Sequence, residues 1–537
     1  MTDRFLERWV PVLSRNARAN KHGRSRGWPK LSYVSVSGWF LLAAVASLAI
    51  ADIAITALDP WSELRRLVSG VIRPDFFSIE AMSVIWTVAF AVLGVALGAS
   101  CGFLMALIFE RSRGVRLISA FLRSVHELFW ALLLLQITGL SPLTGILAIA
   151  IPYAGIFAKV FAEMIEEADL SAERVLPPGT SIVSRFAYAR IPVIAGPMKT
   201  YTLYRLECGL RSTLVLGFIG LPTIGFHLDS FFKQGNYAQA AALLACFYVL
   251  IGTRRLWARA WTVPFLIIAS VLVLPEAVGG GSAWANLERF VTRDIVPSPL
   301  RGGDLLALDT WANFGGWAWN ILAHQVAPGV AQTLILSQIA LAATGVLALV
   351  VFPMVCRRFW GRAGHYLGRI LLVVVRSTPE YMLAYVLLLI MGPSMLPAII
   401  ALSLHNGAIV GYLLGRHADG LEYRLDAPRG LNLYAYETVP RLYGQFLAYM
   451  LYRWEIILRE SAIFGILGVA TLGYYVDAAI SELRLDVAVF LVFAVAALSM
   501  TVDSLSRWLR RRLRIEMLPT RLANEPGGDA ISGVTCR

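Results

Sequence analysis

The stretch Tyr201-Thr-Leu-Tyr204-Arg205-Leu-Glu207 returns 248 residues later as Tyr449-Met-Leu-Tyr452-Arg453-Trp-Glu455. The match continues at the same offset through an arginine, three glycines and an aspartate. These are Arg211, Gly217, Gly220, Gly225 and Asp229 in the first copy, and Arg459, Gly465, Gly468, Gly473 and Asp477 in the second. An offset that holds over nearly thirty residues indicates a tandem duplication, which governs every later inference.

The composition is that of a membrane protein. The 537 residues are 57% hydrophobic and 15% charged, with a mean hydropathy of +0.65. Apolar runs of about 20 residues, enough to cross the hydrocarbon core of a bilayer, recur along the chain. The sequence lacks the short alternating strands of a β-barrel. We therefore expect an all-α polytopic membrane protein.

Twelve apolar segments are predicted to span the membrane. They are Gly38–Ala57, Met82–Phe109, Leu117–Thr138, Leu143–Phe161, Lys199–Leu221, Ala238–Thr253, Trp261–Val278, Thr333–Val355, Ile370–Met391, Leu396–Leu414, Phe446–Val469 and Val487–Leu505. The net charge of +13 is concentrated in short basic clusters that all fall on one side of this count. That distribution follows the positive-inside rule and disfavours a nucleic-acid partner.

Six spans in each half give the two halves the same orientation in the membrane. They are therefore parallel repeats about an axis along the membrane normal, and a transport pathway is expected between them. The predicted division is a basic cytoplasmic segment at 1–37, a first repeat at 38–260 with its core at 80–258, a second repeat at 261–514 with its core at 325–514, and a cytoplasmic tail at 515–537.

A polar loop in each half is the most specific candidate for docking a partner. In the first half Glu173 precedes Gly179 by six residues and Pro192 follows after thirteen, whereas the second half has Gly430 and Pro440. This spacing predicts a helix, a turn that glycine permits, a second short helix, and a proline where the chain re-enters the membrane. An ordinary cytoplasmic loop is the alternative interpretation.

This loop, followed by Tyr-Arg-x-Glu and the glycine-rich span, resembles the permease subunit of phosphonate-type ABC importers. The same resemblance extends to Arg376-Ser-x-Pro379-Glu380, to the Leu404-His405 step and to the motif around Arg453. It covers roughly residues 80–258 and 325–514. It implies two permease units of the type I importer kind fused in one chain.

The resemblance also implies partners and a location. A separate ATPase dimer would bind the loops that contain Glu173, Gly179, Pro192, Gly430 and Pro440. An external substrate-binding protein would deliver a small phosphorus oxyanion such as a phosphonate or phosphite. The chain would lie in the inner membrane of a bacterial cell with both termini in the cytoplasm. The two loops depart from one another, because Arg424 stands where Glu173 does and the second loop is shorter.

Ionisable residues within the predicted spans are candidates for the pathway or its gate. An intramembrane charge is costly unless it is paired or faces a cavity. Glu207–Arg211 and Glu455–Arg459 are each spaced to pair along one helix face. These four residues, with Arg205, Asp229, Arg453 and Asp477, form the candidate set. A purely structural ion pair is the alternative.

A second charged pattern is the match between Arg123-Ser-Val-His-Glu127 and Arg376-Ser-Thr-Pro-Glu380. Because each arginine opens a predicted span, we expect Arg123, Glu127, Arg376 and Glu380 to anchor helix ends at the membrane surface. The lone histidines at 126 and 405 suggest packing or helix-end hydrogen bonding, and no metal site is predicted. The duplicated glycines favour either close helix packing or a bend beside the pathway.

The sequence argues against an enzyme. None of the five lysines (21, 30, 159, 199 and 233) follows a glycine, so the chain lacks the phosphate-binding loop Gly-x4-Gly-Lys-[Ser/Thr]. We expect no directly bound cofactor and assign ATP use to a partner. Three alternatives stay open: a fused permease of a ferric-iron importer, an ion-coupled secondary transporter with Asp52 as its carrier, and a channel.

Overall fold

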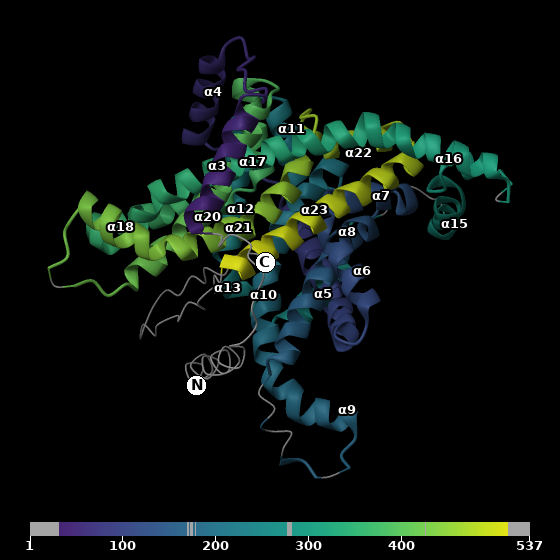
Figure 1. The fold of residues 1–537 in the computed structure, drawn as a ribbon, viewed down its shortest axis with the longest axis horizontal. Coiled ribbons are helices and arrows are strands. Elements are labelled where there is room, and N and C mark those ends of the chain that lie inside the picture. Colours follow the sequence, from purple (N-terminus) through teal and green to yellow (C-terminus); the bar gives the residue numbers. More distant parts are fainter. Residues whose placement is uncertain are drawn as a thin grey trace.

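A computed structural model of the chain describes residues 32–168, 171, 175–177, 179–276, 282–304, 306–424 and 426–513. Every regular element in these residues is helical, which confirms the predicted all-α polytopic class. Figure 1 shows the helices as one assembly, with α4 (Pro60–Ile72) and α11 (Ile224–Lys233) at the upper end and α9 (Ile182–Arg185) projecting from the lower end.

The two halves repeat the same order of helices. In the first half the order is α5 (Ala81–Phe109), α6 (Arg113–Ser124), α7 (Glu127–Thr138), α8 (Pro142–Glu166), α10 (Ile191–Leu216), α11 and α12 (Tyr237–Gly252). In the second half it is α17 (Ala327–Val351), α18 (Arg357–Ser377), α19 (Glu380–Met391), α20 (Met395–Asp419), α21 (Val439–Ser461), α22 (Leu472–Ser481) and α23 (Leu485–Leu513).

The twelve predicted spans each overlap a helix or a bent helix pair. Five helical segments are long and apolar enough to cross a membrane, and the number rises to eight if each bent pair is one span. Three shorter apolar helices, α3 (Tyr33–Leu48), α12 and α14 (Val263–Leu272), account for three more predicted spans. The one remaining predicted span, Phe446–Val469, corresponds to α21, whose five charged residues lower its hydropathy.

Two predicted spans are wrong as continuous helices. The segment 117–138 is α6 and α7 joined at a 96° bend, and the segment 370–391 is α18 and α19 joined at an 89° bend. In the second half Pro379 precedes α19 and is incompatible with an unbroken helix. In the first half His126 caps α7, because its Nδ1 accepts a hydrogen bond from the Leu128 amide at 3.3 Å.

The two halves also share the residue types at equivalent helix ends. The bent pair ends at Gly139 in the first half and at Gly392 in the second, both with positive φ. The next helix is capped by a serine in each case, Ser141 for α8 and Ser394 for α20. The same residue types thus end and begin equivalent helices in both halves.

Each half is held together by two helices in unusually close contact. Gly94, Gly98 and Gly102 lie on the face of α5 that packs against α8. In the second half the glycines are on the other helix, since Gly407 and Gly411 of α20 face α17 and Gly415 faces the short helix η8 (Phe352–Val355) that continues it. Small residues allow transmembrane backbones to approach closely, so the duplicated interface is preserved although the glycines have changed helix.

The short helices that follow the glycine-rich breaks are fixed by another duplicated bond. The amide of Ile224, the first residue of α11, donates to the Thr87 hydroxyl at 2.9 Å. The amide of Leu472, the first residue of α22, donates to the Thr333 hydroxyl at 3.0 Å. Each threonine thereby satisfies one backbone donor that a helix start leaves open.

The glycines in these breaks serve both of the predicted purposes, at different positions. Gly220 and Gly468 turn the chain in the left-handed region, with φ of +92° and +87°. Gly217 and Gly465 instead lie against Gly225 and Gly473 of their own turns, where a Cβ would overlap the neighbouring backbone. The close packing is therefore within the turn, and α10 and α11 differ in direction by 53°.

The first helix before each repeat core packs against the other repeat. The side chain of Gln338 on α17 donates to the Phe40 carbonyl of α3 at 2.9 Å, and Tyr443 of α21 donates to Ser37 at 2.6 Å. Conversely, Trp86 of α5 donates to the Val273 carbonyl, just beyond α14, at 2.8 Å. The exchange of first helices ties the two halves together.

The predicted first span is shorter than expected. The helix α3 ends at Leu48, and the chain then runs on without helix to Asp59. Its backbone is bound to the bend between α19 and α20, since the amides of Thr56 and Ala57 both donate to the Met391 carbonyl. The proposed ion carrier Asp52 lies in this exposed segment, where its carboxylate accepts from the Ala54 amide. It is not a mid-helix carboxylate.

Candidate functional site

A polar cavity of about 140 Å³ lies between the two halves. Its wall comes mainly from equivalent elements of each half: α7, α8 and α10 from the first, and α19, α20 and α21 from the second, to which the end of α18 adds Arg376. The charged residues that line it are Glu127, Arg205, Glu207, Arg211, Arg376, Glu380, Arg453, Arg459 and Glu460, and two histidines, His126 and His405, join them. The cavity is therefore the place where the duplicated motifs meet.

The first half presents an arginine held by aromatic side chains. The Nε of Arg205 donates to the Tyr201 hydroxyl at 2.9 Å, and its guanidinium carbon lies 5.3 Å and 5.8 Å from the ring centres of Tyr201 and Tyr153. On the same wall Ser212 donates to the Glu127 carboxylate at 2.9 Å. These contacts fix the guanidinium and the carboxylate in one orientation.

The second half presents its equivalent arginine through an amide. The Nη1 of Arg453 donates to Asn406 Oδ1 at 3.2 Å, and Asn406 Nδ2 donates to the Glu460 carboxylate at 3.1 Å. By position in the repeats, Asn406 corresponds to Tyr153 and Glu460 to Ser212. The second half thus has a carboxylate, Glu460, at the position where the first half has a serine.

A histidine lies beside the bend glutamate in both halves, although it comes from different positions in the sequence. His126 of the first bend lies 3.8 Å from Glu127, and His405 of α20 lies 3.8 Å from Glu380. The position equivalent to His126 is Pro379, and the position equivalent to His405 is Pro152. Both halves therefore pair an imidazole with the bend glutamate, but the histidine comes from the bend in the first half and from α20 in the second.

Three of these groups could hold a metal ion. Glu380, His405 and Glu460 offer ligand atoms that all lie within 4.8 Å of one another. Carboxylate and imidazole are common ligands of zinc and other divalent metals. The sequence offered no such grouping, because the three residues lie on three separate helices.

Several polar atoms of the lining residues have no hydrogen-bond partner among the described residues. They are the hydroxyls of Tyr204 and Tyr381, Nη2 of Arg205, Nε of Arg211 and Nη2 of Arg453. Arg205 and Arg453 are only 3% exposed. A buried unsatisfied guanidinium N–H is expensive, so these atoms indicate a site that receives an acceptor.

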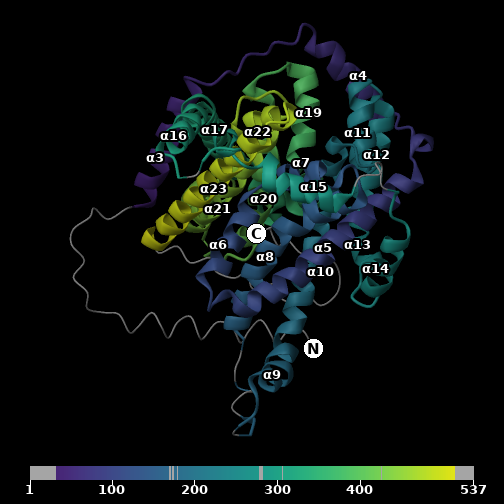
Figure 2. The same ribbon diagram turned by 90° about the vertical axis from the view of Figure 1, so that its right-hand side faces the viewer.

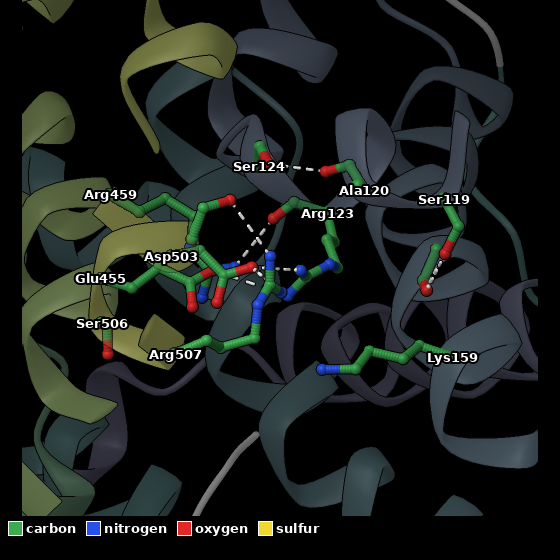
Figure 3. Close-up of polar contacts among 12 residues, drawn as sticks. Ser119, Ala120, Arg123, Ser124, Lys159, Glu455, Arg459, Asp503, Ser506 and Arg507 are labelled. Atoms are coloured by element: carbon green, nitrogen blue, oxygen red, sulfur yellow. Dashed lines mark hydrogen bonds and ion pairs between the residues drawn. The ribbon is translucent and has the colours of Figure 1, made fainter. Parts of the chain in front are cut away.

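Beside the cavity, a salt-bridge network joins the halves (Figure 3). Arg123 of α6 is bound by Asp503 of α23 at 2.7 Å and by Glu455 of α21 at 3.5 Å. Arg507 also binds Asp503, and Arg459 donates to the Arg123 carbonyl at 2.9 Å. The predicted Glu455–Arg459 pair is therefore wrong, because both residues turn to Arg123 instead.

The equivalent region in the first half is arranged differently. Glu207 does pair with Arg211, at 3.5 Å, as predicted, and also with Arg254 at 3.4 Å. Arg376, the counterpart of Arg123, lines the cavity and stacks over the Tyr412 ring at 4.5 Å. One arginine is thus part of a closed network, and its counterpart faces the cavity.

The candidate residues therefore separate into groups. Arg205, Glu207, Arg211, Arg453 and Arg459 line the cavity, as do three of the four bend residues, Glu127, Arg376 and Glu380. Glu455 and Arg123 form the neighbouring network. The two aspartates lie apart, since Asp229 pairs with Lys233 on α11 and Asp477 lies on α22.

The loop residues lie away from the cavity. Gly179 and Gly430 adopt left-handed turns with φ of +89° and +63°. Pro192 and Pro440 are each the second residue of a long helix, α10 and α21. A π-helical turn precedes each of these helices and joins it without a gap. The prediction of a separate short helix before each proline is therefore wrong, because that helix continues directly into α10 or α21. Glu173 lies outside the described residues.

Sequence reasoning missed Glu460, Tyr204 and Tyr381 as cavity residues, and it missed Asn406, which links Arg453 to Glu460. One signal was present for Glu460: a second acidic residue directly after Arg459 in an apolar span, where the first repeat has Ser212. Tyr204 recurs as Tyr452 in the duplicated stretch, which was a signal for it, whereas nothing in the sequence distinguished Tyr381.

The chain is similar to known permease proteins. No family model and no solved structure matches it. It is 26% identical over 508 residues to the phosphate-import permease protein PhnE of Mycolicibacterium smegmatis, an alignment that covers 88% of this chain and 93% of that protein. It is 25% identical over 235 residues to the phosphite transport system permease protein PtxC of Stutzerimonas stutzeri, covering 42% of this chain and 85% of that protein.

Proposed function

We propose that this chain, a homologue of the phosphonate- and phosphite-type permease proteins of ABC importers, forms the membrane pathway of an ATP-driven importer for a small phosphorus oxyanion. The observation that carries the proposal is the arginine-lined cavity between the two halves. In a duplicated transporter with parallel repeats, the interface of the repeats is where a substrate crosses.

The lengths of the two relatives support a fused arrangement, as does the internal repeat. One relative aligns over nearly its whole length with nearly this whole chain. The other aligns over 85% of its own length with only 42% of this chain, which supports a single unit of about half the size. Two such units in one polypeptide would replace the pair of separate subunits.

Coupling to ATP would run through the loops at Gly179 and Gly430. Each loop lies directly before a helix, α10 or α21, that contributes an arginine to the cavity. A partner that moves the loop can therefore move Arg205 or Arg453 through a continuous helix. The partners in this proposal are an ATPase dimer in the cytoplasm and an external substrate-binding protein, with the chain in the bacterial inner membrane and both termini inside.

A mild-detergent purification of the tagged chain from its native membranes, with mass spectrometry of the co-purifying proteins, tests the proposal. Two copies of a P-loop ATPase per chain are expected. A captured binding protein would then be titrated with phosphonates, phosphite, phosphate and ferric ion, which separates the phosphorus importer from the iron alternative. Recovery of the intact chain without any ATPase, under conditions that preserve known ABC complexes, would contradict the proposal.

The ion-coupled alternative now depends on different residues. Asp52 is exposed in a loop, but Glu380 and Glu460 bring two half-buried carboxylates together in the cavity. Carboxylates of this kind carry protons or sodium in secondary transporters. Uptake into vesicles that is driven by an imposed proton gradient without ATP would favour that alternative.

A further inference from the structure

We propose that the cavity is a discrete binding site for one phosphorus oxyanion inside the membrane domain, with Arg205 and Arg453 as its main contacts and Glu460 as the residue that keeps its affinity low. This inference rests on the proposed function and adds to it a site, its contacts and the origin of its asymmetry.

The two arginines occupy equivalent positions and are prepared for a ligand in the same way. In each, one nitrogen is held by a neighbour, Tyr201 or Asn406, while Nη2 is buried and has no partner among the described residues. The held nitrogen fixes the plane of the guanidinium, so the remaining N–H groups point in set directions. Guanidinium groups bind phosphate-like oxygens strongly, often through two bonds.

The cavity has room for such a ligand. Its volume of about 140 Å³ is several times the ~30 Å³ that one water molecule occupies in the liquid. The hydroxyls of Tyr204 and Tyr381, also without partners among the described residues, add two donors to the wall. An oxyanion with three or four oxygens offers acceptors for such donors.

The charge of the wall favours an anion. Five arginines and four glutamates line the cavity, which leaves one net positive charge. A divalent metal ion at Glu380, His405 and Glu460 would place two more positive charges among these arginines. Burial in a medium of low polarity strengthens that repulsion. The same setting stabilises a bound anion, which would otherwise be costly to bring into the membrane.

Glu460 opposes the anion. Asn406 links its carboxylate to Arg453, so an anion must compete with Glu460 for this half of the site. In the first half the equivalent residue is the neutral Ser212. A transport site must bind tightly enough to admit its substrate and weakly enough to release it. We infer that Glu460 supplies the weakening and that binding is stronger at Arg205 than at Arg453.

The experiment is calorimetric titration of the full chain in lipid nanodiscs with phosphite, methylphosphonate and phosphate, and with chloride as the control anion. Saturable binding of at least one phosphorus anion is expected. Arg205→Gln should weaken it by tenfold or more, and Arg453→Gln by a smaller factor. The matched control is Arg484→Gln, which removes an exposed arginine outside the cavity and should leave the affinity unchanged.

The Glu460→Gln variant separates loss of the site from misfolding. A misfolded protein can lose anion affinity, but it does not gain affinity. It should tighten anion binding severalfold, while Tyr204→Phe should weaken it slightly. No saturable binding in the native chain and in Glu460→Gln would overturn the inference, as would equal affinities in all the arginine variants. Zinc binding that requires Glu380 and His405, without anion binding, would also overturn it.

Failure of this inference is distinguishable from failure of the proposed function. A chain that co-purifies with its ATPase but binds no anion would be an importer permease without a discrete site. A chain that binds the anion but recruits no ATPase would hold the site in a different class of transporter.

Discussion

The first and second halves of this protein share one architecture but differ at two of the places where they touch. Around the cavity, the tyrosine and serine of the first half, Tyr153 and Ser212, are replaced by Asn406 and Glu460 in the second. Beside it, Arg123 is enclosed by two carboxylates while Arg376 faces the cavity. The duplicated arginines show what the site requires, and the replaced neighbours show how the halves became specialised.

Fusion explains how such differences arise. In an assembly of two identical chains, each substitution appears twice and the site stays symmetric. In a single chain, one half can acquire a carboxylate while the other keeps a hydroxyl. The exchanged first helices hold the two halves together, since α3 packs on the second core and α14 packs on the first (Figure 2).

The largest effect is expected at the Arg123 network. Asp503→Asn removes the charge of a buried carboxylate that is the closest partner of Arg123, and it should destabilise the protein by about 3 kcal/mol. The matched control is Arg507→Gln. Because the Arg507 side chain is 38% exposed, its loss should lower the stability much less. Thermal loss of monodisperse protein in detergent measures both variants.

A double variant sharpens this result. If the network is an ion cluster whose charges need one another, Arg123→Met combined with Asp503→Leu should be more stable than Asp503→Asn alone. A double variant that is less stable than the single one would mean that the charges have a role beyond mutual neutralisation.

A second prediction makes the halves alike. Ser212→Glu should cost roughly 2 kcal/mol, because it places a second buried carboxylate against Glu127 without the amide that serves Glu460. The reverse exchange, Glu460→Ser, should be tolerated and should copy the first half. Equal stability of the two variants, measured by thermal unfolding, would show that the asymmetry of the cavity has no structural basis.

A third prediction concerns the glycines that changed helix. Gly102→Ala should destabilise the first half by about 1–2 kcal/mol, because the new methyl group would press on Phe157 of α8. Gly411→Ala should do the same in the second half against Val351. Gly38→Ala in α3, where the added methyl meets nothing, should be neutral or stabilising, which thermal unfolding of the three variants can show.

The smallest effect on stability is expected at the two loops. Gly179→Val and Gly430→Val place a branched residue in a left-handed backbone conformation, which should cost less than about 1 kcal/mol each, below the ~1–2 kcal/mol of a rigid site, because both turns are exposed and can relax. Transport coupling should suffer far more than stability, measured as uptake per ATP hydrolysed. The first loop should be the more sensitive, since the second is shorter and has Arg424 in place of Glu173. Normal coupling in both variants would remove the loops from the mechanism.

Much of the fold followed from the sequence because duplication supplies its own check. A single offset aligned tyrosines, charges and glycines, and the structure places these residues on equivalent helices. The bends at His126 and Pro379 were missed, because each lies inside an apolar run long enough to cross the membrane. Hydropathy reports length and polarity, but it is insensitive to a change of direction.

The cavity was only partly predictable for a related reason. Spacing along one helix suggested a Glu455–Arg459 ion pair. In the structure both residues instead contact Arg123 of another helix, Glu455 through an ion pair and Arg459 through a hydrogen bond to the Arg123 carbonyl. The cluster of Glu380, His405 and Glu460 comes from three helices, so no local spacing reveals it. Pairing along a helix contributes a few tenths of a kcal/mol, and tertiary contacts between buried charges readily exceed it.

The most direct test of the central claim is uptake by the purified chain, reconstituted in proteoliposomes with its co-purified ATPase and binding protein. We expect accumulation of a labelled phosphite, phosphonate or phosphate that requires ATP and the binding protein, and that is lost in Arg205→Gln but kept in Arg484→Gln. Accumulation driven by a proton gradient in the absence of ATP and of both partners would contradict the account.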